Sequence, residues 1–170
     1  YGDWSSDVCS SDLAPLGDIE ALAQKLGRWG DLVKAYETLA AGTQDPKEAA
    51  VFHFLAGNVL DQRAKTPEIA SRSYLAALTA CPKEPKILGD IARFFERRAE
   101  WTSACLAFAQ HLEAVPDDPK ERLRLLKRLA TIQETGLNAP KKAVEYLQKA
   151  VELDPKDADG IKKLLAVAEK

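Results

Sequence analysis

The chain has 170 residues, of which 46% are hydrophobic and 29% charged, with a formal net charge of −2. This composition indicates a soluble globular protein rather than a disordered chain. The near-neutral charge provides no global basic field for nucleic acid. No apolar run approaches the roughly 18 residues that cross a bilayer. We therefore expect one folded domain of ordinary size and no membrane-spanning segment.

Residues 1–13 differ from the rest of the chain. They read YGDWSSDVCSSDL, rich in Ser and Asp and without a helical period. The segment resembles the translation of a common short-read sequencing adapter, which matches Asp3 to Leu13 without a mismatch. We expect it to be an artefact outside the folded domain, like a cloning scar, with the natural N-terminus missing. The alternative is a disordered natural terminus.

A helical pattern runs through the remaining residues, and no stretch alternates polar and apolar residues as a strand would. Breaks at Gly and Pro predict nine helices, over residues 15–26, 30–41, 47–63, 67–80, 86–98, 101–114, 120–135, 140–153 and 158–169. Asp45 and Asp118 precede a proline and predict N-caps, because Asp accepts hydrogen bonds from free N–H groups. Glu48 and Glu121, three residues later, predict capping boxes.

Four positions recur in register along the chain. Three sets share an internal spacing of four, three and five residues: Ala70, Tyr74, Ala77 and Pro82; Ala104, Phe108, His111 and Pro116; Ala143, Leu147, Ala150 and Pro155. The step from the second set to the third is five residues longer than the step from the first to the second, which predicts a longer helix beginning near Lys120. Such a period indicates a helical repeat array whose neighbours stack to share a core.

A longer period indicates a duplication. The sequence Asp-Pro-Lys-Glu at residues 45–48 recurs at residues 118–121, and Pro67 recurs at the same offset as Pro140. The offset between Trp29 and Trp101 is shorter by a single residue. We infer an ancestral unit of two repeats that was duplicated.

Residues 85–118 resemble the tetratricopeptide repeat, a helix–turn–helix motif of about 34 residues. The residues that carry the resemblance are Leu88, Ile91, Ala92 and Phe95 in the first helix, Trp101 at the turn, and Ala104, Phe108 and Pro116 in the second. His111 departs from the motif, which prefers a small residue there. The resemblance implies an all-α solenoid of antiparallel helix pairs, like those of large bacterial scaffold proteins. Its repeats are expected at about 15–41, 47–80, 85–118 and 119–155, with a partial repeat at 157–170.

No catalytic constellation is evident. The phosphate-binding glycine loops, the nucleophile elbow and the zinc-protease motif are absent from the sequence. The only histidines, His53 and His111, have no ligand-spaced partner, and Cys81 and Cys105 form no CxxC pair. We therefore expect no enzyme activity, no cofactor and no metal, and we assign His111 to packing.

The resemblance also implies where a partner would lie, because the first helices of this family line the ligand groove. In the ungapped repeat these positions are Lys86, Gly89, Asp90, Arg93 and Arg97, and in the longer repeat the candidates are Arg124, Lys127 and Arg128. Together they predict a basic patch across two repeats, suited to an acidic peptide or a C-terminal carboxylate. The alternative is a solvated helix face with internal ion pairs. The Lys and Asn set of the family's chaperone-tail clamp is absent.

The favoured function is a non-catalytic scaffold that binds a protein partner in the groove. Two alternatives stay open. A helical-repeat RNA-binding module is disfavoured by the near-neutral charge and by the lack of aromatic residues within the basic stretch. A regulatory segment of a larger, truncated enzyme is the other.

The last predicted helix carries an apolar face that nothing in the sequence covers. We expect Ile161, Leu164, Leu165 and Val167 to be exposed there, which favours a chain cut at this end and self-association through that face.

Overall fold

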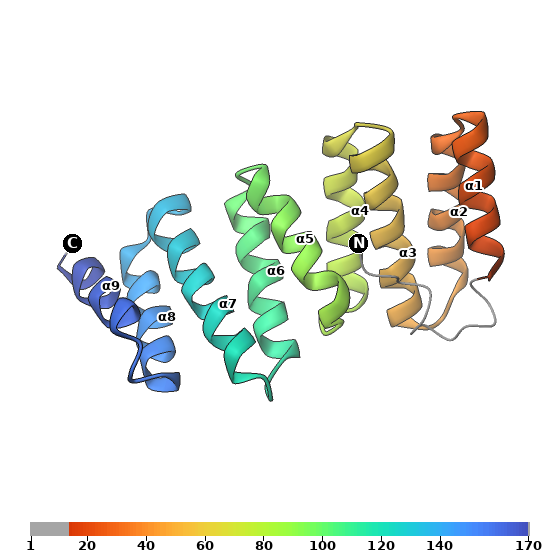
Figure 1. Ribbon diagram of the computed structural model, residues 1–170. Coiled ribbons are helices and arrows are strands. Elements are labelled where there is room, and N and C mark those ends of the chain that lie inside the picture. The colour runs from red at the N-terminus through yellow and green to blue at the C-terminus, as the bar shows by residue number, and fades with distance from the viewer. Residues whose placement is uncertain (1–13, 170) are drawn as a thin grey trace. The chain divides into compact units, whose positions relative to one another are not determined.

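The computed structural model describes residues 14–169, and over this range the chain forms helices and no strands. The elements are α1 (Ala14–Leu26), α2 (Trp29–Gly42), α3 (Pro46–Asn58), η1 (Val59–Arg63), α4 (Pro67–Ala80), α5 (Pro85–Arg97), α6 (Trp101–Ala114), α7 (Pro119–Thr131), η2 (Ile132–Gly136), α8 (Pro140–Leu153) and α9 (Ala158–Ala168). Consecutive helices pair as antiparallel hairpins (Figure 1). The all-α prediction is confirmed. The expected adapter segment, residues 1–13, lies outside the described residues.

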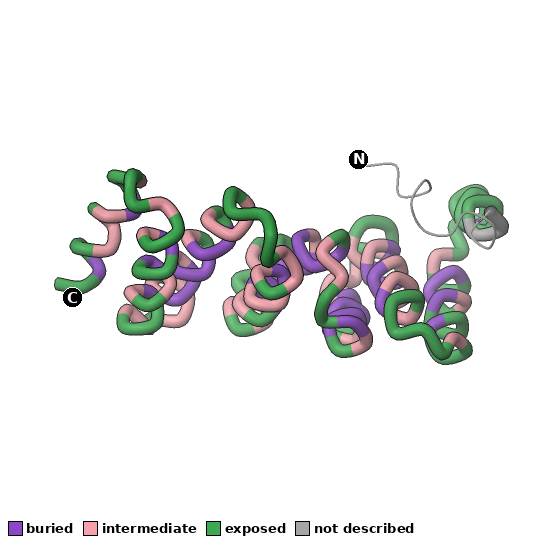
Figure 2. Tube along the Cα trace, turned by 90° about the horizontal axis from the view of Figure 1, so that it is seen from below, coloured by how far each residue is buried: buried purple, intermediate pink, exposed green. Residues whose placement is uncertain are grey.

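The helices form two compact units, one ending at Ala76 and the other beginning at Ala77. Within the first unit, α2 packs against both α1 and α3. Within the second, α5 to α9 pack each against the next. In each unit the buried turns lie where a helix faces its neighbour, and the outer turns are exposed (Figure 2). Each unit therefore builds its core from contacts between successive helices.

The recurring helix positions found in the sequence lie in the buried core. The five alanines at these positions are fully buried: Ala70, Ala77, Ala104, Ala143 and Ala150. The larger side chains between them are also buried: Tyr74, Phe108 and Leu147. Because alanine ends at Cβ, two helix backbones approach closely there, and the larger side chains fill the space between turns.

The duplication extends to the backbone. The same offset that relates Asp45 to Asp118 also relates two sets of helices. It moves the bounds of α3, η1 and α4 onto those of α7, η2 and α8. Both η1 and η2 are π-helical, and each is followed by a left-handed residue: Lys65 (φ 56°) and Asn138 (φ 49°). Helices α5 and α7 have the same length, and η2 adds five residues to α7. The π-helical turn thus accounts for the extra length of the longer repeat.

Both predicted N-caps are present, but the capping boxes are wrong. The Asp45 and Asp118 carboxylates each accept a backbone N–H bond, at 2.8 and 3.0 Å. The Glu48 carboxylate accepts a bond of 2.6 Å from the Thr43 hydroxyl, and Glu121 turns to an arginine on its own helix. At Glu121 the reason is that a guanidinium is a stronger donor to a carboxylate than the N–H group of the cap.

The last helix is more buried than expected from the sequence. Val167 is only 3% exposed and lies in a cluster with Ala130 and Leu147, against which Leu164 packs. Leu165 is exposed. The expectation of an uncovered apolar face is therefore wrong for Val167, because α9 packs on α8.

The two copies differ in the size of their residues at one core contact. In the first unit Gly57 lies against Tyr74, and a Cβ added to Gly57 would be 2.6 Å from the ring carbon Cε1. The Tyr74 hydroxyl donates a 2.8 Å bond to Asn58, which fixes the ring. In the second unit the equivalent residues, at the offset of the duplication, are Ala130 and Leu147, both buried.

We predict that Gly57→Ala lowers the free energy of unfolding by about 1–3 kcal/mol through overpacking, although alanine favours helix. The loss of unfolding free energy should be smaller in a Tyr74→Leu background, because the double variant then has the alanine and leucine found at Ala130 and Leu147 of the second unit. Urea midpoints of the four proteins measure this coupling.

Gly30→Ala is the control, because nothing lies within 4 Å of its added Cβ. It should be neutral or stabilising. An equal loss from Gly57→Ala in both backgrounds would contradict the Gly57–Tyr74 contact.

Candidate functional site

The candidate site is a cavity of about 340 Å³ within the second unit. Its lining residues are Arg93 and Glu96 from α5, Phe108 from α6, and Arg124, Lys127, Arg128 and Thr131 from α7. Four of these seven are cations and one is a carboxylate. The cavity therefore has a basic wall built by two neighbouring helix pairs.

The sequence of α7 explains why its cations share one side. Arg124, Lys127, Arg128 and Thr131 occupy positions i, i+3, i+4 and i+7, which places them on one face of a helix. Leu125, Leu126 and Leu129 lie between them in sequence and are buried. The amphipathic period thus holds the leucines in the core and turns the cations to the cavity.

The structure brings together four of the sequence-predicted groove residues: Arg93, Arg124, Lys127 and Arg128. The other four do not line the cavity: Lys86, Gly89, Asp90 and Arg97. Lys86 and Arg97 are exposed on α5, whereas Gly89 is buried. Asp90 forms an ion pair with Arg93 one turn later.

Each cation at the cavity is paired with a carboxylate. The pairs are Arg93 with Asp90, Arg124 with Glu121, Lys127 with Asp157, and Arg128 with Glu96. Glu121 accepts two bonds from Arg124, 2.8 Å from Nε and 2.5 Å from Nη2. The Arg128–Glu96 pair (2.6 Å) joins α7 to α5. Because the four cationic side chains are 38–55% exposed, such pairs contribute at most about 1 kcal/mol each.

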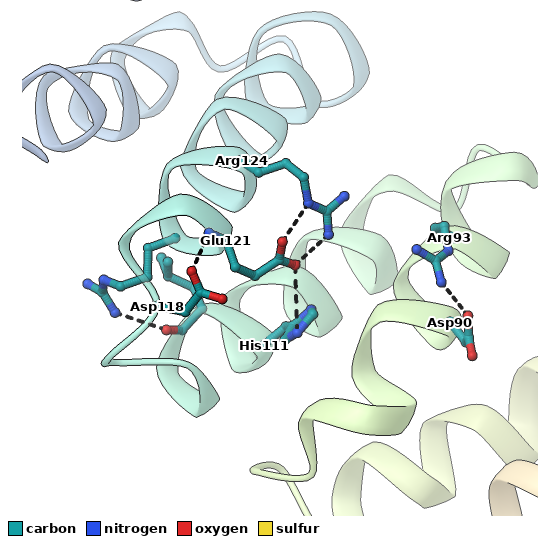
Figure 3. A network of polar contacts seen from close by, with 8 residues as sticks. Asp90, Arg93, His111, Asp118, Glu121 and Arg124 are labelled. Atoms are coloured by element: carbon teal, nitrogen blue, oxygen red, sulfur yellow. Dashed lines mark hydrogen bonds and ion pairs between the residues drawn. The ribbon is translucent and has the colours of Figure 1, made fainter. Parts of the chain in front are cut away.

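A buried histidine lies behind the basic wall. The His111 side chain is 9% exposed, and its Nε2 is 3.9 Å from Oε1 of Glu121. Its ring lies over Gly89, where an added Cβ would be 3.3 Å from Cε1. Nδ1 is buried and has no hydrogen-bond partner among the described residues. Figure 3 shows Glu121 between His111 and Arg124, with Arg93 and Asp90 on the neighbouring helix.

The surroundings of His111 favour the neutral imidazole. Burial lowers the pKa of His111. The Glu121 carboxylate raises it by less than burial lowers it, and the positive charges of Arg124 and Arg93 each lower it by a smaller amount again. The hydrogen bonds from Arg124 hold the pKa of Glu121 below its ordinary value. At neutral pH a neutral His111 therefore faces an ionised Glu121.

Sequence reasoning found the cations but missed most of their partners. The spacing of three residues between Glu121 and Arg124 is a recognisable helix pair. No sequence pattern joins Glu96 to Arg128, because these residues meet only when two helix pairs pack. Phe108, which lines the cavity, carries no sequence signal beyond its place in the core.

Antiparallel helix pairs, with a cavity lined mainly by charged residues between α5 and α7, define an all-α helical-repeat protein. The family model of the tetratricopeptide repeat matches residues 87–123, which cover most of α5, all of α6 and the start of α7. The chain therefore contains a tetratricopeptide repeat over these residues, and this repeat is in general a protein–protein interaction module. No curated protein matches the chain significantly. None of the helices in residues 14–169 has the length and apolar character needed to cross a bilayer.

We predict that Glu96 and Arg128 are energetically coupled. A double-mutant cycle with Glu96→Gln and Arg128→Gln should give a coupling energy of about 0.2–1 kcal/mol at low salt, decreasing as salt screens the pair. Urea unfolding measures it. The matched control combines Glu96→Gln with Lys141→Gln, at an exposed lysine on α8, and should be additive. A coupling of zero at low salt would contradict the ion pair.

Protonation of His111 should destabilise the fold as pH falls. Because folding lowers the pKa of His111, the unfolded chain binds more protons than the folded one below the ordinary histidine value of 6.5. Stability is then fully present above that pH and declines below it. His53, whose pKa is also lowered by burial, contributes with the same sign. The contribution of Glu121 to the pH dependence of stability lies at lower pH, below the ordinary carboxyl pKa of 4.5.

Urea titrations between about pH 7 and pH 5 test this linkage. We expect His111→Gln to reduce the dependence of unfolding free energy on pH, with His53→Gln removing a separate, additive part. An unchanged slope in His111→Gln would refute the assignment.

Proposed function

We propose that the cavity between α5 and α7 binds an acidic segment of a partner protein. The observation that carries the proposal is the meeting of Arg93, Arg124, Lys127 and Arg128, from two helix pairs, around one cavity. A segment lying across both helices would contact all four at once. Charge-assisted bonds from guanidinium groups to carboxylates are among the stronger polar contacts in proteins.

The internal ion pairs leave donors for such a ligand. A guanidinium carries five N–H donors. Glu96 engages Nε of Arg128, and Asp90 engages Nη2 of Arg93, so other nitrogens of both groups can donate to an incoming carboxylate. Because exposed pairs are weak, a ligand with several carboxylates can also replace an internal partner at small cost. The internal carboxylates then act as competitors that reject weakly acidic segments.

We also propose a division of the chain into four repeats and the first helix of a fifth. The helix pairs α1–α2, α3–α4, α5–α6 and α7–α8, followed by α9, support this division. The cavity would then lie between the third and fourth repeats.

The full chain should bind an acetylated, C-terminally amidated peptide of alternating Asp and Glu, with affinity that falls as salt rises. The triple variant Arg93→Gln, Arg124→Gln, Arg128→Gln should bind at least about tenfold more weakly, because it loses three charge-assisted contacts. Fluorescence anisotropy of a labelled peptide measures both.

The matched control is Lys141→Gln, Lys156→Gln, Lys162→Gln, which removes the same charge from exposed lysines of the same unit. It should bind like the parent protein. Equally weakened binding in both triple variants would show that the peptide responds only to the net charge of the protein. No binding by the parent protein would reject the proposal.

Two further ligands separate related possibilities. A free-acid version of the peptide that binds much more tightly would assign the site to a C-terminal carboxylate. Binding of a single-stranded oligonucleotide in place of the peptide would favour the RNA-binding alternative.

A further inference from the structure

We infer that binding of an acidic segment at this cavity is coupled to uptake of one proton by His111, so that acidification tightens binding. This inference rests on the proposed function and concerns the regulation of the same site. It begins from the position of His111. This histidine faces Glu121, which is paired with Arg124 of the cavity wall.

The charged groups that face His111 come from the two helices packed against α6. Helix α5 contributes Arg93, which is paired with Asp90, and α7 contributes Glu121 and Arg124. Arg93 and Arg124 both line the cavity. Two of the cations that would bind the ligand therefore add to the effect of burial in disfavouring a charge on His111.

Glu121 connects the two events. In the free protein both of its oxygens are occupied by Arg124, and Oε1 lies 3.9 Å from Nε2 of His111, beyond hydrogen-bond distance. A ligand carboxylate that takes the Arg124 donors releases Glu121 toward the histidine. It also neutralises the cations that repel an imidazolium. Both effects favour protonation.

The proton step is simple. The unprotonated ring nitrogen of His111 takes one proton from solvent, so that both nitrogens carry hydrogen and the ring gains one positive charge. The N–H at Nε2 then donates to Glu121, and the bound ligand balances the charge on the arginines. Nδ1 is not held by another residue of the described chain, so no existing bond has to break.

Reciprocity fixes the direction of the effect. If ligand binding increases the proton affinity of His111, protonation of His111 must increase the affinity for the ligand by the same factor. A rise of one pKa unit on binding corresponds to at most about tenfold tighter binding at acid pH. Above about pH 5 the ligand's own Asp and Glu side chains stay ionised, so the enhancement should appear between about pH 7 and pH 5.

Isothermal titration calorimetry of the full chain with the amidated Asp–Glu peptide tests the coupling. Runs in buffers of different ionisation heat report the protons exchanged. We expect net uptake of up to one proton per peptide at about pH 6, essentially none at about pH 8, and several-fold tighter binding at the lower value. His111→Gln should bind with no uptake, whereas His53→Gln, the matched control, should behave as the parent.

Each other outcome is decisive. Peptide binding without proton uptake, or with the same uptake in His111→Gln, overturns the coupling and leaves the proposed function standing. No binding at either pH overturns the proposed function and this inference with it.

A second measurement needs no ligand. An NMR titration of the His111 ring should show a lower pKa in Glu121→Gln, which loses the favourable carboxylate, and a higher pKa in Arg124→Gln, which loses the repelling cation and frees Glu121. Identical titrations in the parent and both variants would overturn the contact network on which the coupling depends.

Discussion

The structure depends on close packing between helix backbones at buried alanines. Ala104 and Ala143 each stand where a larger side chain would hold two helices apart, and both are fully buried. Close packing lets every helix pair bury its apolar side against the next pair, so the core of a unit is built up from one neighbour to the next. It also sets the width of the space between the first helices of neighbouring pairs. The cavity between α5 and α7 is a consequence of that geometry, and its chemistry was free to vary.

The two units show how much variation the shared backbone tolerates. The π-helical turn and the left-handed residue that follows it are kept in both, while side chains in contact have changed together. The first unit has a cavity of about 210 Å³ that includes Leu55 and Asn58, and the equivalent residues of the second unit, Arg128 and Thr131, line the basic cavity. The equivalent helices α3 and α7 therefore present a leucine and an asparagine to a cavity in one unit and mainly cations in the other. The basic cavity is a property of particular side chains and not of the fold.

The sequence predicted what is local and periodic. Over residues 14–169 the nine predicted helices agree closely with the observed bounds, because prolines and caps mark their ends, and the period of the duplication reappears in the bounds of six elements. The cations of α7 were found because they recur on one helix face. The π-helical turns were not predicted, because a π turn differs from an α turn in the hydrogen bonding of the backbone and not in its apolar period. The pairing of Lys127 with Asp157 was missed for another reason, since it depends on how α9 packs beside α7.

His111 is the point at which packing and charge conflict. The equivalent residues in the other two sets, Ala77 and Ala150, are fully buried alanines that need no polar partner. A histidine there needs room, which the missing side chain of Gly89 provides, and it leaves a buried nitrogen without a partner among the described residues, which costs stability. An alanine would avoid that cost but would leave the space above Gly89 unfilled, so the histidine combines a packing contact with an unpartnered nitrogen. In the coupling that we infer, its place behind Glu121 and Arg124 gives the histidine a second role, because protonation on binding would strengthen the complex.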